Sequence, residues 1–255
     1  MIIPSRLRTG ADGVLFLEKA IRSIFHQSIA PKLAIDVVIG VDPGSTIPSN
    51  AQFLQTVCFV QSGEASQASA LNAAARTLDH SYLAILEDDD EWHPDYLMVA
   101  MEALNQAEFI SSTQIQFDAR GEVVCINDFP TPSGWVMSRK VWETIGAFNE
   151  SYRFHLDSEW LGRLAESGIK RGHLVEATAP LDQRWMTMVR PWLHHVLTQG
   201  GPASSIVRHQ SAFPLIRRLV YEGSGMHAIM VDPVARKRSQ MEHAWLKRRF
   251  GRIPW

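Results

Sequence analysis

Residues 82–94 read YLAILEDDDEWHP, and this stretch indicates the fold class of the chain. Its first five residues are apolar, as in a strand that is buried in a parallel sheet. Acidic side chains follow without interruption from Glu87 to Glu91, and Pro94 stands where a helix would begin. Adjacent carboxylates repel one another unless a cation neutralises them. The stretch therefore predicts a buried strand that ends at a cation-binding edge.

Strands and helices alternate around this stretch. Apolar runs predict further strands at 1–4, 35–41 and 56–60, and helical spacing of apolar residues predicts helices at 14–25, 67–78 and 95–106. Up to about residue 106, this alternation is typical of an α/β fold with a mostly parallel sheet covered by helices.

The pattern changes after residue 106. Two strand-like runs, 109–117 and 122–127, flank a turn that ends in glycine and predict an antiparallel hairpin. Helices are predicted from Ser138 to Ile145 and from about residue 157 to 166, each followed by a glycine. Beyond residue 190, helical periodicity is found at 212–221 and 234–249.

Length and composition exclude several classes of protein. The chain has 255 residues, of which 45% are apolar and 20% are charged, and its formal net charge is −2. These values fit one large α/β domain or two small ones and exclude a small disulfide scaffold. Since there is no basic excess, we expect no nucleic-acid partner.

The cysteines and the N-terminal residues bear on localisation. Cys58 and Cys125 lie far apart and lack metal-ligand spacing, so we interpret both as buried thiols in a reducing compartment. No apolar run approaches the roughly 20 residues of a membrane span, and residues 1–4 do not begin a signal peptide. We expect a cytoplasmic protein.

The acidic run after residue 86 predicts a metal site. Hard oxygen ligands suit Mg²⁺ or Mn²⁺, which proteins commonly hold with one or two carboxylates plus substrate phosphates. Ligands of open α/β sheets also bind at the carboxyl ends of the strands. The alternative is a solvated acidic turn in front of a helix.

Several motifs stand in the order of one enzyme family. They are residues 2–6 (IIPSR), 16–17, 23–27, the turn 42–45 (DPGS), Asn72, the acidic residues 87–94, residues 139–150, and Asp157 with Arg163 and Leu164. Together they resemble the family 2 glycosyltransferases with the GT-A fold, over about residues 1–190. Pro43, Leu71 and Leu156 depart from the family pattern.

The resemblance implies a domain organisation and an activity. Residues 1–190 would form the GT-A domain, with a nucleotide-binding half at 1–106 and an acceptor-side half at 107–190. A small antiparallel element and a helical C-terminal extension at 191–255 would complete the chain. The implied activity is metal-dependent transfer of a sugar from a nucleotide-diphosphate sugar to an acceptor hydroxyl, with inversion, in glycan or polysaccharide biosynthesis.

The resemblance also assigns roles to matching positions. Asp89 would bind Mn²⁺ or Mg²⁺ between the nucleotide phosphates, and Asp157 would be the general base. Asp42 would accept a hydrogen bond from the nucleotide base. Further nucleotide-sugar contacts are expected at Pro4, Ser5, Arg6, Asn72, Glu87 and Asp88, of which Glu87 or Asp88 would contact the ribose or help to hold the ion.

Alternatives remain for single residues and for the whole chain. Asp157 also suits a helix N-cap, and Asp42 a turn. A histidine, among them His155, His194, His195 and His209, would complete the metal shell or simply lie on the surface. As a whole, the chain would alternatively be a nucleotidyltransferase that makes nucleotide sugars, or a non-catalytic relative that binds sugar or nucleotide.

The tail at 232–255 is basic, with seven Lys or Arg residues against two acidic ones. A basic amphipathic helix would lie on an anionic membrane, where a lipid-linked acceptor resides, or would pack on the domain. We expect the packed helix. The acceptor is expected to be a glycan, a lipid-linked molecule or a small molecule.

Overall fold

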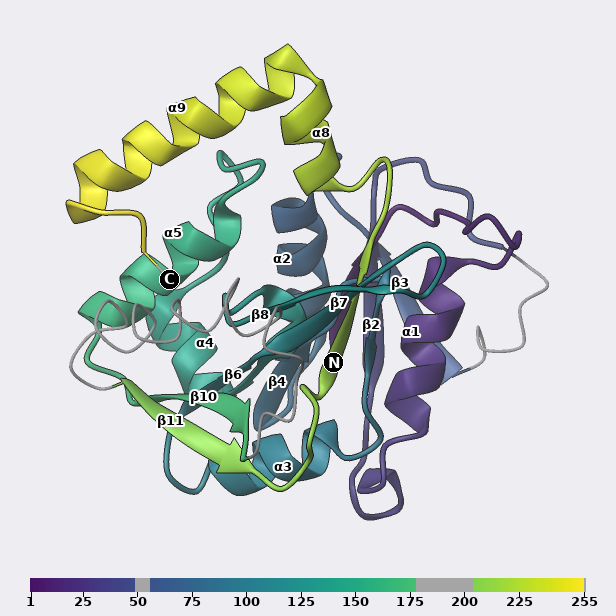
Figure 1. Ribbon diagram of the computed structural model, residues 1–255, viewed down its shortest axis with the longest axis vertical. Coiled ribbons are helices and arrows are strands. Elements are labelled where there is room, and N and C mark those ends of the chain that lie inside the picture. Colours follow the sequence, from purple (N-terminus) through teal and green to yellow (C-terminus); the bar gives the residue numbers. More distant parts are fainter. Residues whose placement is uncertain (49–55, 178–203, 255) are drawn as a thin grey trace.

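The structure, a computed structural model, describes residues 1–48, 56–177 and 204–254 (Figure 1). Its described strands form two sheets, the larger with the order β11-β10-β6-β9-β4-β1-β2-β3. Neighbours in this sheet are parallel except at β9, which runs antiparallel to β4 and β6. The strand bounds are β1 Ile2–Ser5, β2 Val37–Val41, β3 Val57–Gln61, β4 Tyr82–Ile85, β6 Phe109–Ser112, β9 Trp135–Ser138, β10 Arg171–Glu176 and β11 Ser204–His209.

The smaller sheet has the order β5-β12-β7-β8. Strand β12 is antiparallel to β5 and parallel to β7, and β7 and β8 form an antiparallel hairpin. The bounds are β5 Asp90–Trp92, β7 Gln114–Asp118, β8 Val123–Asn127 and β12 Ile216–Val220. This sheet therefore joins the acidic stretch to a strand from the C-terminal part of the chain.

Helices cover both faces of the larger sheet because successive strand residues point to opposite sides. Ile2 and Val38 pack with α2, α4 and α5, whereas Ile3 and Ile39 pack with α1 and α3 on the other face. The helix bounds are α1 Phe16–Phe25, α2 Gln67–Thr77, α3 Tyr96–Ala103, α4 Arg139–Ile145, α5 Leu156–Glu166, α8 Gly225–Val231 and α9 Pro233–Phe250, with short 3₁₀ turns η1 Ala30–Lys32 and η3 Pro132–Gly134.

Gly40, in the middle part of β2, allows α2 to lie directly on the sheet. A Cβ atom at position 40 would stand 2.1 Å from the Ala70 carbonyl oxygen, deep inside van der Waals contact. The buried residues of α2 that face the core include Ala68 and Ala74, whose small side chains permit the same close approach. The glycine thus sets the distance between helix and strand.

The α/β prediction with a mostly parallel sheet is confirmed, and most predicted elements lie within a few residues of their expected bounds. The run 109–117 differs, because it divides at the buried Thr113 into β6 of the larger sheet and β7 of the smaller one. The helix predicted at 212–221 is wrong. Its residues 216–220 form β12, since pairing with β5 and β7 overrides the local periodicity.

Three further expectations concern single residues and boundaries. The interpretation of both cysteines as buried is wrong, because Cys58 is exposed on the edge strand β3 and Cys125 is partly exposed. The domain boundary near residue 190 lies outside the described residues and stays a prediction. Within the described residues, no helix combines the length and apolar character that a bilayer span requires.

Helix α9 packs on the domain through one face (Figure 1). Its buried residues are Ala235, Ser239, Glu242 and Leu246, at spacings that keep them on one side of a helix. Trp245 and Phe250 also pack against the core, and the Phe250 ring lies where a Cβ atom on Gly162 of α5 would be. Met241 is exposed instead. The inner face of α9 is therefore part of the fold.

This packing predicts unequal effects of substitutions on the two faces of α9. Leu246→Ala should lower the free energy of unfolding by about 2–5 kcal/mol, because it leaves a cavity under a fully buried side chain. Met241→Ala, on the exposed face, should change it by less than about 0.5 kcal/mol. Urea denaturation measures both values, and equal effects would contradict the packing.

Candidate functional site

The parallel strands β4, β1 and β2 end at one edge of the larger sheet. Residues predicted to contact the nucleotide-sugar donor lie at the ends of these strands. Asp88 follows β4, and its Oδ2 accepts hydrogen bonds from the Ser5 hydroxyl at 2.5 Å and from the Arg6 backbone N–H at 3.3 Å. The Arg6 guanidinium lies 3.5 Å from the carboxylate of Asp42, which follows β2. The structure thus brings Ser5, Arg6, Asp42 and Asp88 together.

The other carboxylates of the acidic run have different partners. Glu87 accepts hydrogen bonds from the Gln67 amide at 2.5 Å and from the Ser133 hydroxyl at 3.3 Å. Asp90 is buried and accepts hydrogen bonds from the same hydroxyl at 2.6 Å and from the Leu219 backbone at 3.1 Å. The run is therefore built into the fold rather than a solvated turn.

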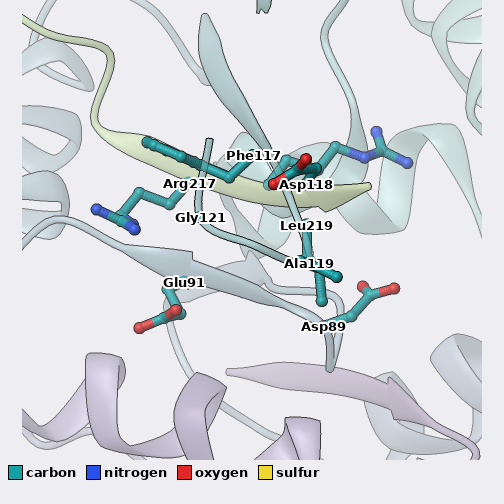
Figure 2. A pocket seen from close by; sticks show the side chains of 9 residues that line it. Asp89, Glu91, Phe117, Asp118, Ala119, Gly121, Arg217 and Leu219 are labelled. Atoms are coloured by element: carbon teal, nitrogen blue, oxygen red, sulfur yellow. The ribbon is translucent and has the colours of Figure 1, made fainter. Parts of the chain in front are cut away.

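Asp89 differs from its neighbours, because no described residue donates a hydrogen bond to its carboxylate. It lines a pocket of about 160 Å³ between β5 and the β7–β8 hairpin. Figure 2 shows Asp89 and Glu91 on one side of this pocket and Asp118 on the other. The carboxylate of Asp89 is therefore available to a ligand.

Arg218 of β12 supplies positive charge to the acidic run. Its guanidinium lies 3.9 Å from the Glu87 carboxylate. Burial opposes the charge of Arg218, but the carboxylates of Glu87, Asp90, Asp89 and Asp157 raise its pKa. Arg218 thus stays charged, and its charge acts both on the acidic run and on Asp157.

Burial raises the pKa values of the acidic run. The pKa of Asp88 rises to about 6 and that of Asp90 to about 7, mainly because burial disfavours their charged forms. Burial also raises the pKa of Asp89 well above its usual range, and the charges of Asp90, Asp88 and Glu87 add to this shift. A bound cation would reverse these shifts, since it favours the charged carboxylates.

Asp157 lies at the second position of α5, facing the same charges. Burial raises its pKa to about 7, the Glu87 charge adds to the shift, and Arg218 opposes it. The N-cap of α5 is His155 rather than Asp157, and the Asp157 Oδ1 accepts a hydrogen bond from the Ser158 N–H at 2.7 Å. The carboxyl group of Asp157 therefore has a pKa near neutral pH and feels the charges of Glu87 and Arg218.

Pro4 and Asn72, which are also predicted to contact the nucleotide sugar, are both buried. Pro4 is buried in β1, paired with Gly40. Asn72 is 3% exposed, and its amide bonds the backbone of Phe148 and the Glu150 carboxylate. The structure shows Asn72 as a link between α2 and residues 148–150, and donor contacts of both residues stay predictions.

Two of the histidines considered as metal ligands, His155 and His209, are partly or fully buried. His155 bonds Ser239 and stacks on His243, and burial lowers the pKa of His155 and of His209 to about 4. His194 and His195 fall outside the described residues. In the part of the chain that the structure describes, no group of three or more His, Cys, Asp or Glu side chains is arranged to hold a metal by itself.

The site nevertheless fits a divalent ion of the kind that substrate phosphates help to hold. Asp89 offers oxygen ligands that no described hydrogen bond occupies, and one or two carboxylates suffice when phosphates complete the shell. A positive charge beside Asp89 would also relieve the repulsion among the carboxylates of the acidic run. The residues present thus fit Mg²⁺ or Mn²⁺ at Asp89.

Residues 2–124 match the family model described as Glycosyl transferase family 2. These residues, just under half of the chain, are similar to the family 2 glycosyltransferases, and the chain has the GT-A fold. No curated protein sequence matches it at a significant level.

Solved structures share this GT-A fold at low sequence identity. S. aureus TarS has a TM-score of 0.54 at 11% identity, over 98% of this chain and 43% of that chain. Its residues 1–349, in complex with UDP-GlcNAc, give 0.55 at 12% identity, over 98% and 72%. The mannosyltransferase PcManGT from Pyrobaculum calidifontis, in complex with GDP-Man and Mn²⁺, gives 0.52 at 18% identity, over 67% and 52%. The present chain thus spans less than half of the full TarS chain.

Sequence reasoning missed three residues of this candidate site. Arg218 lies in a run interpreted as a helix, and Ser133 lies in η3 without a motif. Gln67 was expected only to begin a helix, yet its amide bonds Glu87. Strand pairing alone brings Arg218 and Ser133 to the acidic run, so no local signal could have identified them.

The raised pKa values predict how the stability of the protein depends on pH. Asp88 and Asp90 have folded-state pKa values of about 6 and 7, above the ordinary value of 3.8, so folding takes up protons. The free energy of unfolding of the metal-free protein should therefore fall as the pH rises from about 4 to 7. Melting temperatures at pH 5 and pH 8 measure this slope.

Asp89→Asn should raise the melting temperature at pH 8, because it removes one repelling charge. The control is Glu64→Gln, an exposed change of equal charge, which should have little effect. A lower melting temperature for Asp89→Asn at pH 8 would show that its carboxylate stabilises the metal-free fold.

Proposed function

We propose that the protein is a metal-dependent, inverting glycosyltransferase that moves a sugar from a nucleotide-diphosphate sugar to an acceptor hydroxyl in glycan or polysaccharide biosynthesis. The observation that carries the proposal is that the charge of Arg218 interacts with two kinds of carboxylate. Asp88 and Asp89 stand at the strand edge where a donor would bind, and Asp157 faces the same charges from α5.

Ser5, Arg6, Asp42 and Asp88 form the proposed donor end of the site. Asp42 would accept a hydrogen bond from the nucleotide base, and Asp88 would contact the ribose. Arg6 already spans these two acids, with its guanidinium near Asp42 and its N–H on Asp88. TarS is solved in complex with UDP and with UDP-GlcNAc, and PcManGT in complex with GDP-Man, which supports a nucleotide-sugar donor here.

Asp89 is the proposed ligand of Mn²⁺ or Mg²⁺. The ion would neutralise the departing diphosphate. The protein's part is to hold the carboxylate of Asp89 toward the pocket while its neighbours are bonded elsewhere. Arg218 adds a fixed positive charge beside it, and Glu87 keeps that guanidinium in place.

Asp157 is the proposed general base. As the acceptor oxygen bonds to the anomeric carbon, the bond from that carbon to the diphosphate oxygen breaks, and the acceptor proton passes to the Asp157 carboxylate. Attack on the face opposite the leaving group inverts the anomeric centre. A pKa near 7 suits a base that works at neutral pH.

A metal-dependent donor site predicts a specific binding defect. Asp89→Ala should abolish the Mn²⁺-dependent binding of UDP and GDP while the protein stays folded, because a partly exposed carboxylate adds little to the core. Glu91→Ala, in the same pocket, is the matched control and should keep this binding. Calorimetric titration with and without Mn²⁺ decides, and unchanged metal-dependent affinity of Asp89→Ala would refute the role.

A general base at Asp157 predicts a loss of turnover without a loss of binding. Asp157→Asn keeps the size of the side chain but cannot take the acceptor proton, so kcat should fall about 10²–10⁴-fold while the affinity for UDP barely moves. In the wild type, kcat should fall below about pH 7, because Asp157 must be deprotonated to act. A near wild-type rate of Asp157→Asn would contradict the assignment.

The non-catalytic alternative rests on Pro43, Leu71 and Leu156. Leu156 is 3% exposed and packs in the core, so it leaves Asp157 in place. Nucleotide binding without transfer to any acceptor would favour this alternative. The nucleotidyltransferase alternative expects a glycine-rich loop and a lysine after the first strand, where residues 5–10 read SRLRTG.

The acceptor and the cellular site are part of the same proposal. Free thiols at Cys58 and Cys125 agree with a reducing, cytoplasmic compartment. Arg236, Lys237 and Arg248 are exposed on α9, so a lipid-linked acceptor on an anionic membrane would meet positive charge there. Salt-sensitive co-sedimentation with anionic vesicles would support that peripheral contact over a glycan or small-molecule acceptor.

A further inference from the structure

Helix α9 contacts the segment 151–155, which leads directly into α5 (Figure 1). Arg238 donates a hydrogen bond to the Ser151 carbonyl. Trp245 meets the Tyr152 ring edge to face, with ring centroids 5.6 Å apart. The remaining residues of the segment are held by a carboxylate. Contacts thus follow the whole approach to the helix that carries Asp157.

The carboxylate of Glu242 is 0% exposed and accepts hydrogen bonds from three successive backbone N–H groups. Its Oε1 accepts from the Arg153 N–H at 2.7 Å. Its Oε2 accepts from the Phe154 N–H at 2.9 Å and from the His155 N–H at 3.1 Å. The Arg238 guanidinium donates to Oε1 at 2.7 Å and balances the buried charge.

The Glu242 carboxylate lies where the N-terminus of α5 lacks hydrogen-bond acceptors of its own. His155 is the N-cap of α5, and its side chain makes no capping hydrogen bond with a described residue. The first N–H groups of a helix need acceptors, and a negative charge there also interacts favourably with the helix dipole. Glu242, 87 residues away along the chain, accepts hydrogen bonds from the N–H of the N-cap residue His155 and also from those of the two residues before it. An apolar residue at position 242 would leave these groups unpaired.

The contacts of His155 strengthen the same arrangement. Its Nε2 lies 2.7 Å from the Ser239 hydroxyl, and its ring stacks on His243 with centroids 4.0 Å apart. Both the backbone and the ring of His155 are thus fixed by α9. Asp157 follows two residues later, so this backbone determines where its carboxylate lies.

We propose that Glu242 is a positioning residue for sugar transfer, which holds the backbone before α5 so that Asp157 meets the acceptor hydroxyl. The inference rests on the proposed function, since it needs Asp157 to act on the acceptor. A displacement of about 1 Å in a reacting group can lower a rate about 10²-fold. Loss of the hydrogen bonds from Glu242 should therefore lower kcat. Donor binding depends on Ser5, Asp42 and Asp88, which α9 does not hold.

The test is the effect of Glu242→Gln and Glu242→Ala on kcat and on UDP affinity. Glu242→Gln loses one acceptor oxygen and the charge, and Glu242→Ala loses both oxygens. We expect kcat to fall about tenfold for the first and about 10²-fold for the second, with UDP affinity in the presence of Mn²⁺ unchanged. Wild-type kcat in both variants would overturn the proposal.

Leu246→Ala is the control for a purely structural role, because it weakens the packing of α9 on the core but removes no hydrogen bond to 151–155. At a temperature where it and Glu242→Ala are equally folded, its kcat should match the wild type. An equal loss of kcat in Leu246→Ala would overturn the proposal. Arg249→Ala, which breaks the exposed ion pair with Glu166 at 2.8 Å, should also leave kcat unchanged.

A double variant separates this proposal from the function on which it rests. In the background of Asp157→Asn, the change Glu242→Ala should lower kcat little further, because the group that it positions is gone. A full additional loss would show that Glu242 acts elsewhere. If Asp157→Asn alone keeps its rate, the proposed base is wrong, whatever the Glu242 variants show.

Ser239→Ala serves if the Glu242 variants do not fold. It removes the hydroxyl beside the His155 ring and leaves the buried carboxylate in place. We expect a several-fold fall in kcat, unchanged UDP affinity and a melting temperature close to that of the wild type. A wild-type kcat for folded Ser239→Ala would overturn the proposal in that case.

Discussion

The charge of Arg218 allows carboxylates from two parts of the chain to share one edge of the sheet. Glu87, Asp89, Asp90 and Asp157 all act on this guanidinium, and each would otherwise repel the others in a partly buried site. Arg218 owes its place to β12, which lies between β5 and β7. The site therefore depends on a strand that follows almost the whole domain in the sequence.

The consecutive acidic side chains of the run point in different directions, and each has different partners. Asp88 bonds toward β1, Asp90 bonds toward Ser133 and β12, and Asp89 faces the pocket. Two of the three are thus tied down, which leaves one carboxylate for a ligand. A run of like charges is stable here because the fold separates its members.

The sequence predicts those parts of the fold and the site that depend on neighbouring residues along the chain. The apolar runs at β1, β2 and β4 are visible in the sequence, and parallel strands end together, so Ser5, Asp42 and Asp88 could be expected to meet. Arg218 and Glu242 could not be predicted. Their roles arise from pairing and packing with residues about 90 to 130 positions away. A helical periodicity even suggested the wrong element for β12.

The contact between Gly40 and Ala70 restricts which mutations the chain can accept. Helix α2 lies as close to β2 as the backbone allows, and the first residue of α2, Gln67, reaches Glu87 from there. A larger residue at position 40 would push the helix outward and withdraw that amide from the acidic run. Position 40 contributes no side chain to the site, yet its freedom to vary in evolution is limited by the site's geometry.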